Sequence, residues 1–480
     1  MPLEKEKIQN FLNEQIAQAD FRTRAYVYDR DGKLRPRRDI FQNITRHIHK
    51  FYSEKSTIRW ITLTGLRGAG KTTVLSQAYD FIRNLDCHKL FLSLDQTSQI
   101  LGVSLPEVIS AYEDLLGKSL EMLDRPLFLF LDEVQYDEKW GITLKSIYDR
   151  SENIFIFSTG SSALLMNKNK DIVRRTVYEK LFPLSFCEYL KIKHKKHPDE
   201  NRDLSQEISR AIFFSKNAKD AYSQLQKLQR NITKYYAGII YRHEFKKYLY
   251  YGSLPYMLTV DNEAIIYDQI SKTMDRVVAM DIRSAKNFTS DIISKIPRIL
   301  YAVADMDAFN FSTLSEAFQI SRPKVMEIFD FLEQTEVLHR IYPHGSHLGQ
   351  EARKPSKYLF SSPAFRAMYY KMVGNIISPE NAKGRLLEDL VGMYLYRLFA
   401  KNPEVSFTYD SAQGGADFIV GIGGRKIVIE VGSGQKSYRQ VISTAKKVKP
   451  AYSLIISDEE LEFSEELNAL KVPFNIFVLA

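Results

Sequence analysis

Residues 65–72 of the chain read Gly-Leu-Arg-Gly-Ala-Gly-Lys-Thr, which matches the pattern G-x-x-x-x-G-K-[ST]. An apolar stretch from Ile58 to Thr64 precedes this segment, and a helical pattern from Thr72 to Asn84 follows it. Glycines let backbone N–H groups converge on phosphates, and the start of the helix directs the positive end of its dipole toward them. The sequence therefore predicts a bound nucleoside triphosphate, namely ATP with Mg²⁺.

The pattern after this loop alternates between strands and helices. Strand-like segments are expected at Lys89 to Leu94, Leu127 to Leu131 and Ile154 to Ser158. Such alternation is typical of a parallel sheet covered by helices, so the predicted fold class is α/β with the parallel sheet of a P-loop NTPase. The residues expected to contact the nucleotide are Gly65, Leu66, Arg67, Gly68, Ala69, Gly70, Lys71, Thr72 and Thr73.

Two carboxylates follow the second of these strands, at Asp132 and Glu133. Because the carboxyl ends of parallel strands meet at one edge of the sheet, both are expected near the bound phosphates. Lys71 is expected to reach the β- and γ-phosphates. Thr72 and Asp132 are the candidate Mg²⁺ ligands, and Glu133 is the candidate group that polarises the attacking water. The alternative is an ordinary core strand that ends in two acidic residues.

The next strand ends in hydroxyl residues, of which Thr159 and Ser161 are candidates to sense the γ-phosphate or the water. The alternative is that they cap the following helix, since serine and threonine are good caps. Phosphoryl transfer also requires a positive group to neutralise charge. Arg174 is the candidate for this role and Arg175 is its neighbour, although either one also suits a surface ion pair.

Length and charge limit the remaining possibilities. A chain of 480 residues exceeds what one hydrophobic core usually organises, so several domains are expected. Two cysteines are too few for a disulfide framework or a cysteine-based zinc site, and the charged amino terminus suggests no export, so a cytoplasmic location is expected. The net charge of +9 favours contact with phosphate backbones only weakly. The basic run from Lys191 to His197 is a secondary candidate for nucleic-acid contact, and a solvated helix end is the alternative.

Five segments follow from the pattern changes along the chain. Residues 312–340 hold two helical patterns, a turn and a strand, which is the outline of a winged helix-turn-helix. A second α/β domain is expected after Gly384, with strands at Val405 to Tyr409, Ala416 to Val420, Lys426 to Val431, Tyr452 to Ile456 and Phe474 to Val478. The predicted division is a helical leader (1–55), a P-loop ATPase core (56–190), a helical lid or linker (191–290), a winged helix (291–360) and a carboxyl-terminal domain (361–480).

Several motifs together resemble a known group, the prokaryotic AAA+-like ATPases whose carboxyl-terminal domain is similar to PD-(D/E)xK nucleases. The resemblance covers most of the chain. It implies an ATPase core, a helical lid, a winged helix and a restriction-endonuclease-like end. The motifs are Gly65 to Thr73, Leu131 to Gln135 followed by Trp140, Thr159 to Ser162, Leu184 to Leu190, Phe245 to Pro255, Gly384 to Glu388, and the segment from Asp417 to Val431.

Three carboxylates of the last domain, Glu388, Asp417 and Glu430, have the spacing of a nuclease core that binds a divalent cation. The family pattern places a lysine two residues after the last acid, and this chain has Gly432 there. Lys436 is near enough in sequence to substitute, but Gly432 to Gly434 is predicted to be a simple turn. A binding or structural role is therefore preferred to nuclease activity.

The leading functional hypothesis is a switch ATPase, in which the nucleotide state changes how the carboxyl-terminal part meets DNA or a protein partner. The second hypothesis is a DNA-binding regulator that uses nucleotide as a structural ligand without significant turnover, and the third is an ATP-gated nuclease. The start of the expected recognition helix carries Ser321, Arg322 and Lys324, which suits DNA contact or packing against a partner. AAA+-like relatives often form rings, so a homo-oligomer is a further possibility.

Overall fold

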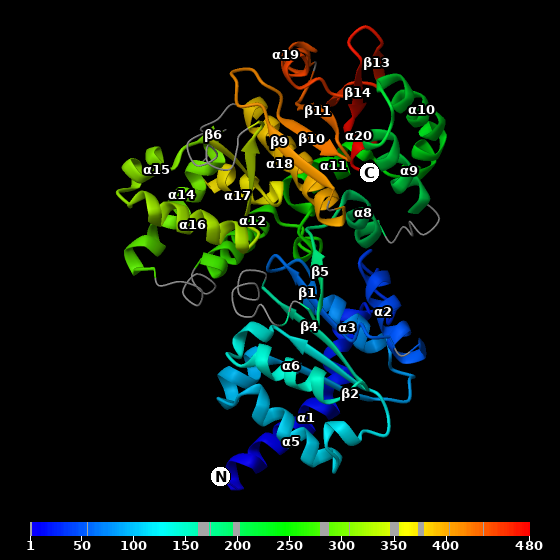
Figure 1. Cartoon of the computed structure of the whole chain (residues 1–480), viewed down its shortest axis with the longest axis vertical. Helices are drawn as coiled ribbons and strands as arrows, with labels where there is room; N and C mark the ends of the chain where they lie inside the picture. Colours follow the sequence, from blue (N-terminus) through cyan, green and yellow to red (C-terminus); the bar gives the residue numbers. More distant parts are fainter. Residues whose placement is uncertain are drawn as a thin grey trace. The chain divides into compact units, whose positions relative to one another are not determined.

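The computed structural model describes residues 2–54, 56–161, 172, 174–194, 202–278, 288–306, 308–345, 355–372, 379–402, 404–434 and 436–480. The chain forms two compact units, Met1–Phe182 and Pro183–Ala480, whose elements are shown in Figure 1. Among the described residues, no helix combines the length and the apolar character that crossing a bilayer requires.

The first unit is built on a five-stranded sheet with the strand order β2-β3-β4-β1-β5 and parallel pairing throughout. The predicted α/β class with a parallel P-loop sheet is therefore confirmed. The strands are β1 (Trp60–Gly65), β2 (His88–Ser93), β3 (Leu127–Asp132), β4 (Ile154–Gly160) and β5 (Val177–Leu181). The main helices are α1 (Pro2–Val27), α2 (Phe41–Glu54), α3 (Lys71–Phe81), α5 (Leu105–Leu116) and α6 (Trp140–Arg150).

Strand β3 shows how this sheet is covered on both faces. Its leucines pack in one core with side chains of α5 and α6, whereas its phenylalanines point to the opposite face. There the Phe128 ring lies 5.3 Å from that of Phe51 on α2, and the Phe130 ring lies 5.4 Å from that of Tyr79 on α3. Because both faces are covered, every residue of β3 is buried, and the strand is held firmly with its carboxyl end at the sheet edge.

The second unit contains a mixed sheet with the order β13-β14-β12-β11-β10-β9-β7-β8-β6. Its strands are β6 (Ala308–Phe309), β7 (Leu338–Pro343), β8 (Ser356–Phe360), β9 (Val405–Tyr409), β10 (Phe418–Ile422), β11 (Arg425–Val431), β12 (Tyr452–Ser457), β13 (Glu462–Ser464) and β14 (Ala469–Pro473). Its principal helices are α8 (Phe186–His194), α9 (Arg202–Phe213), α10 (Ala218–Tyr235), α11 (Tyr241–Lys247), α12 (Glu263–Arg276), α14 (Ser290–Asp305), α15 (Phe311–Phe318), α16 (Arg322–Gln334), α17 (Pro363–Met372), α18 (Pro379–Lys401), α19 (Arg439–Val448) and α20 (Phe474–Phe477).

Helices α15 and α16 and strand β7 lie where two helical patterns and a strand were expected, and β7 pairs antiparallel with β8. The aromatic side chain of Phe329 on α16 packs 4.7 Å from Tyr358 of β8, ring to ring, so it belongs to the core. Strand β7 also pairs with β9, where Tyr342 is opposite Thr408. One continuous sheet therefore joins this helix pair to the carboxyl-terminal strands.

Two details differ from the expectations. The stretch from Phe474 to Val478 was expected as a strand and this was wrong, because residues 474–477 form the short helix α20 directly after β14. Its apolar residues are buried, and a short apolar run of this kind does not distinguish a strand from a buried helix. Strand β5 was not expected, since its sequence, Val-Tyr-Glu-Lys-Leu, has the mixed polarity of an edge strand.

Candidate functional site

The glycine-rich loop lies between the carboxyl end of β1 and the start of α3, as its motif predicts. Gly65 has φ 149°, and a Cβ atom at this position would lie 2.3 Å from the carbonyl oxygen of Leu181 on β5. Gly70 precedes α3 with φ 99°, in the left-handed region that favours glycine. Any side chain at Gly65 would push the loop away from the sheet, so both glycines are required by the local backbone.

Lys71 is buried beside this loop, with only 6% of its surface exposed. Its Nζ donates hydrogen bonds to the carbonyl oxygens of Gly65 (3.0 Å) and Leu66 (3.3 Å). The ammonium group therefore lies across the mouth of the loop, held by neutral carbonyl groups. A phosphate oxygen is a stronger partner for a buried ammonium than a carbonyl oxygen is, because the hydrogen bond is then charge-assisted at both ends.

Asp132 connects the loop to the neighbouring strands. Its Oδ2 accepts a hydrogen bond from the Thr72 hydroxyl at 2.7 Å, and its Oδ1 accepts one from the Thr159 hydroxyl. Only 5% of Asp132 is exposed; burial, together with the nearby Glu133 charge, raises the pKa of this carboxyl group. Thr72 and Asp132 thus present adjacent oxygen atoms of the kind that Mg²⁺ binds, beside the loop where phosphates are expected.

Glu133 has an unusual backbone. Its φ of 54° is in the left-handed region, which is uncommon for a residue other than glycine. The backbone N–H donates to the Thr159 hydroxyl oxygen at 3.1 Å, and the carboxylate accepts a hydrogen bond from the Gln135 side chain. Strained backbone at an observed outlier is found most often at functional sites. Two contacts therefore fix Glu133 immediately after the residue that faces Thr72.

The two expected sensor residues have different positions. Thr159 lies at the end of β4 and contacts both Asp132 and the backbone of Glu133. Ser161 takes part through its backbone, since its N–H donates to Oε1 of Gln135 at 3.3 Å. Residues 162–171, in which a capped helix would begin, lie outside the described residues. Gln135 therefore bridges Glu133 and Ser161. In the sequence, its place in the motif from Leu131 to Gln135 is the one signal that points to it.

The arginines are divided between several roles. Arg175 forms an ion pair with Asp149 on α6, at 2.8 Å from Nε to Oδ1, which is the surface alternative considered for it. Arg174 is exposed and contacts none of the site residues in the part of the chain that the structure describes. Arg67 in the loop donates to the Tyr136 hydroxyl at 3.0 Å.

Arg38 is a buried residue of the first unit that the sequence did not single out. It lies between α1 and α2, and its guanidinium donates to the carbonyl oxygen of Ala69 at 2.8 Å and to that of Phe182 at 2.7 Å. Only 6% of its surface is exposed. The planar fork of an arginine holds two acceptors in fixed positions, so one side chain fixes the loop and the end of the first unit together.

The carboxyl-terminal carboxylates form a second cluster. Lys436 Nζ donates to Oε1 of Glu430 at 2.9 Å, and its Cε lies 1.8 Å from the position that a Cβ atom on Gly432 would occupy. Residues 433 and 434 form the expected bend, and Lys436 also folds back to Glu430, which was the alternative for this segment. Glycine at position 432 leaves the space into which Lys436 folds back from the start of the following segment.

A second lysine enters this cluster from β8. Lys357 Nζ lies 2.6 Å from Oε2 of Glu388 and 3.1 Å from Oδ1 of Asp417, and the lysine side chain is 9% exposed. The two carboxylates raise the pKa of Lys357, although burial opposes them. Burial and the nearby Asp417 raise the pKa of Glu430 to about 8. Across the described residues, no group of three or more acidic, histidine or cysteine side chains has the arrangement of a metal site.

Sequence comparison places this chain among known proteins. Residues 57–190 match a family model described as an AAA domain, and residues 242–372 match a domain of unknown function (DUF8612). Over 434 residues the chain is 34% identical to the uncharacterised protein MJ1637 of Methanocaldococcus jannaschii. This match covers 89% of this chain and 86% of that protein. The chain belongs to the MJ1637 family. A further uncharacterised M. jannaschii protein, MJ1544, is 22% identical over 412 residues, or 83% of this chain and 79% of that protein.

The candidate site residues of this MJ1637 family member, from Gly65 to Ser161, lie within the segment that matches the AAA domain. The chain therefore contains an AAA-type P-loop ATPase domain, as the resemblance implied. Solved structures similar to the chain include AMPPCP-bound DnaA of Aquifex aeolicus. The sequence identity is 14%, the match covers 64% of this chain and 92% of the DnaA chain, and the TM-score is 0.27. Another is the RuvB Holliday junction branch migration motor of Thermotoga maritima. Its identity is 14%, the match covers 72% of this chain and 96% of the RuvB chain, and the TM-score is 0.28. Scores at this level do not establish a shared overall fold.

Proposed function

We propose that the chain binds ATP with Mg²⁺ at residues 65–73 and hydrolyses it as a molecular switch. One observation carries this proposal, namely the hydrogen-bonded series from Thr72 to Asp132, Thr159 and Glu133. These residues come from three elements and meet at the loop edge of the sheet. A loop that only bound nucleotide as a structural ligand would not need the held carboxylate at Glu133.

Each residue has a role in this proposal. Lys71 exchanges the carbonyl oxygens of Gly65 and Leu66 for the β- and γ-phosphates. Thr72 and Asp132 hold Mg²⁺, which neutralises phosphate charge when it is bound. Glu133 orients and polarises the attacking water, and Thr159 keeps its backbone in place. Ser161 and Gln135 complete the wall on the β4 side.

Arg174 is our candidate for a cation that acts at the phosphates after a rearrangement or from a neighbouring copy of the chain. Its support is its exposed, unpaired side chain within the described residues, whereas Arg175 is engaged by Asp149. Arginine in this role neutralises charge that develops during phosphoryl transfer.

Substitution of Lys71 tests the nucleotide site. Lys71→Ala removes the only ammonium group at the described loop, so ATP affinity is expected to fall by at least about tenfold. Isothermal titration calorimetry with ATP and Mg²⁺ measures this. Lys50→Ala on α2 is the matched control, because Lys50 is exposed and has no described side-chain contact with residues 65–73. Equal ATP affinity in Lys71→Ala and wild type would remove the loop assignment.

The output of the switch is proposed to involve the remaining segments: a lid or linker at 191–290, a winged helix at 291–360 and a nuclease-like domain at 361–480. Support for the winged helix comes from helices α15 and α16 and the hairpin of β7 and β8. The start of α16 presents Arg322 and Lys324, although Lys324 pairs with Glu327 at 2.7 Å. We propose DNA or a protein as the partner of this part.

Cleavage of DNA is the second candidate function, and the position of Lys436 favours it. The ammonium donates to Glu430 at 2.9 Å, so a lysine lies beside this carboxylate although position 432 is glycine. Lys357 argues for a binding role instead, because its ammonium group stands between Glu388 and Asp417, the two carboxylates that a divalent cation would need. The two lysines neutralise a cluster that would otherwise attract a metal ion.

A cleavage assay separates these two roles. Wild-type protein, incubated with single- and double-stranded DNA and either Mg²⁺ or Mn²⁺, with and without ATP, is expected to leave the DNA intact. Gel electrophoresis measures the product, with Asp417→Asn as the comparison. Metal-dependent cutting by wild type that disappears in Asp417→Asn would replace the binding role with a nuclease role.

A further inference from the structure

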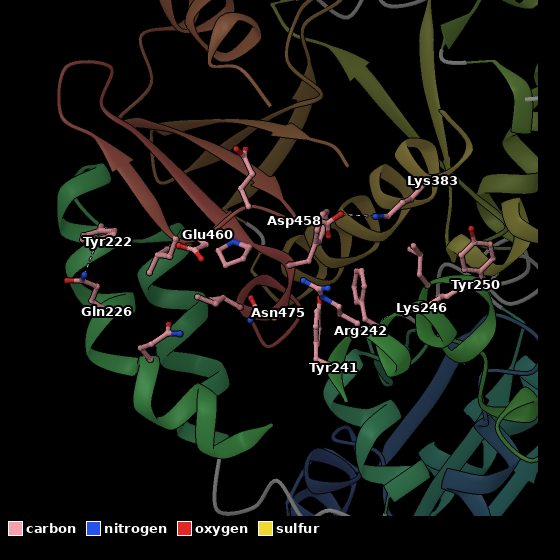
Figure 2. Close-up of a pocket in the computed structure, with 18 residues that line it drawn as sticks. Tyr222, Gln226, Tyr241, Arg242, Lys246, Tyr250, Lys383, Asp458, Glu460 and Asn475 are labelled. Atoms are coloured by element: carbon pink, nitrogen blue, oxygen red, sulfur yellow. Dashed lines mark hydrogen bonds and ion pairs between the residues drawn. The ribbon is translucent and has the colours of Figure 1, made fainter. Parts of the chain in front are cut away.

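The second unit contains a large pocket that is separate from both clusters described above. Its volume is about 1020 Å³, and its walls are α10, α11, α20 and the segment from Asp458 to Leu461 (Figure 2). In Figure 2, Tyr222 and Gln226 lie on one side, Lys246 and Tyr250 lie on the other, and Asn475 lies between them. Pockets for small organic ligands commonly measure about 300–1,000 Å³, so this one has room for a ligand of nucleotide size or somewhat larger.

Two polar atoms in the wall of this pocket are buried without a partner. The Tyr241 hydroxyl and Oδ1 of Asn475 form no hydrogen bond in the described structure. Leaving a buried polar group unsatisfied costs about 1–3 kcal/mol, so native proteins keep few of them. The backbone of Asn475 is engaged, because its carbonyl oxygen accepts from the Tyr236 hydroxyl at 2.7 Å. Both atoms are sealed from water in this structure, so a ligand that pairs with them must first displace neighbouring side chains of the pocket wall.

The charges around the pocket leave a positive excess on α11. Arg242 and Lys246 lie one helical turn apart, both are exposed, and neither forms an ion pair with the described residues. Two of the acidic lining residues are already neutralised: Asp458 pairs with Lys383 at 2.7 Å, and Glu459 pairs with Lys471 at 3.1 Å. Glu460 remains as one acid against the two cations of α11, so an anionic group is favoured beside this helix.

Buried aromatic side chains lie behind the pocket wall, and two tyrosines at its sides are partly exposed. Phe245 stacks on Tyr241, with ring centroids 5.2 Å apart and an interplanar angle of 21°, and lies 5.6 Å from Phe474. Tyr222 and Tyr250 add partly exposed rings from opposite sides. Planar heterocycles stack on partly exposed rings such as those of Tyr222 and Tyr250, and nearby cations contact the phosphates that accompany the bases.

We propose that this pocket binds a nucleotide unit, with its base against the aromatic walls and its phosphate beside Arg242 and Lys246. The base or sugar supplies the partners that the Tyr241 hydroxyl and Asn475 Oδ1 lack. The unit is a free nucleotide or the end of a nucleic-acid strand, since both carry the same base and phosphate. The site is distinct from the ATP site, and its occupant does not need to be hydrolysed.

Calorimetric titration of the full-length protein with AMP tests the proposal. AMP lacks the β- and γ-phosphates that Lys71 is expected to hold, so wild type and Lys71→Ala are expected to bind AMP equally. The double variant Arg242→Ala with Lys246→Ala is expected to weaken AMP binding by at least about tenfold. Arg230→Ala, an exposed position of α10 that does not line the pocket, is the control for changed charge and is expected to leave binding unchanged.

Tyr241→Phe separates binding from folding. Because the Tyr241 hydroxyl has no partner in the described structure, its removal is expected to keep or raise the melting temperature while weakening AMP binding several-fold. A 5′-phosphorylated trinucleotide that binds more tightly than AMP indicates a strand end as the occupant, and equal or weaker binding indicates a free nucleotide. Inorganic phosphate and adenosine, titrated separately, are each expected to bind more weakly than AMP.

Four results would overturn the pocket assignment. They are absence of AMP binding in wild type, equal loss of AMP binding in Lys71→Ala, an equal effect of Arg230→Ala and the double variant, and inorganic phosphate binding as tightly as AMP. Loss of the ATP site alone gives a different outcome, because AMP binding then persists while ATP binding is absent.

Discussion

Replacement of Glu133 by glutamine is expected to lower kcat for ATP hydrolysis by about 10²–10⁴-fold, the range that a positioned general acid or base usually contributes. Glutamine has nearly the same shape but does not polarise water as a carboxylate does. It also tolerates the left-handed backbone no worse than glutamate, so the φ of 54° at this position adds no new strain. Phosphate release under saturating ATP and Mg²⁺ measures the rate.

Glu138→Gln is the control for this substitution, because Glu138 is an exposed acid five residues along the chain. It is expected to retain the wild-type rate. Glu133→Gln should still bind ATP, since the residues that hold the phosphates are unchanged. A wild-type rate in Glu133→Gln would exclude the hydrolytic role of this carboxylate, and absence of turnover in wild type would favour the regulator that uses ATP only as a ligand.

Asp389→Ala is expected to lower the free energy of unfolding of the second unit by about 3–5 kcal/mol, the usual cost of leaving a buried charge without its partner. The Nε atom of Arg366 lies 2.5 Å from Oδ2 of Asp389, and the two side chains are 3% and 0% exposed. The same guanidinium donates to the Ala304 carbonyl oxygen at 2.7 Å, and Asp389 accepts the Phe360 N–H at 3.0 Å. This one pair therefore connects α14, β8, α17 and α18.

Urea unfolding followed by circular dichroism measures this loss, with a separate transition expected for each unit. Asp268→Ala is the control, since Asp268 also pairs with a cation, Lys272 on α12, but with side chains 55% and 70% exposed. Its loss is expected to cost at most about 0.5 kcal/mol. Similar losses in the two variants would show that the buried pair contributes no more than a surface pair.

Local patterns explain which parts of the first unit were predictable. Strand β3 reads as alternating leucine and phenylalanine and then two acids, so both its burial and the place of Asp132 followed from the sequence. The loop motif likewise fixed the bounds of β1 and α3 to within a few residues. Each of these features depends on neighbours in sequence.

Features that depend on distant residues were not predictable in this way. Arg38 reaches acceptors 31 and 144 positions away, and its segment has no motif. Lys357 meets Asp417 60 positions later through the pairing of strands in the second sheet. Gly432 interrupts the nuclease pattern in the sequence, and only the folded chain shows that Lys436 fills the space beside this glycine. Side chains that fold back or cross between elements leave no periodic signal.

The two hydrogen bonds of the Arg38 guanidinium have a mechanical consequence. Phe182, one of its two acceptors, is the last residue before the chain passes into the second unit, and Ala69, the other, is part of the phosphate loop. A guanidinium is rigid and planar, so its two branches cannot lengthen or bend independently. Because both hydrogen bonds come from this one rigid group, a displacement of the phosphate loop is transmitted directly to the exit point of the chain, and a displacement of the exit point is transmitted back to the loop.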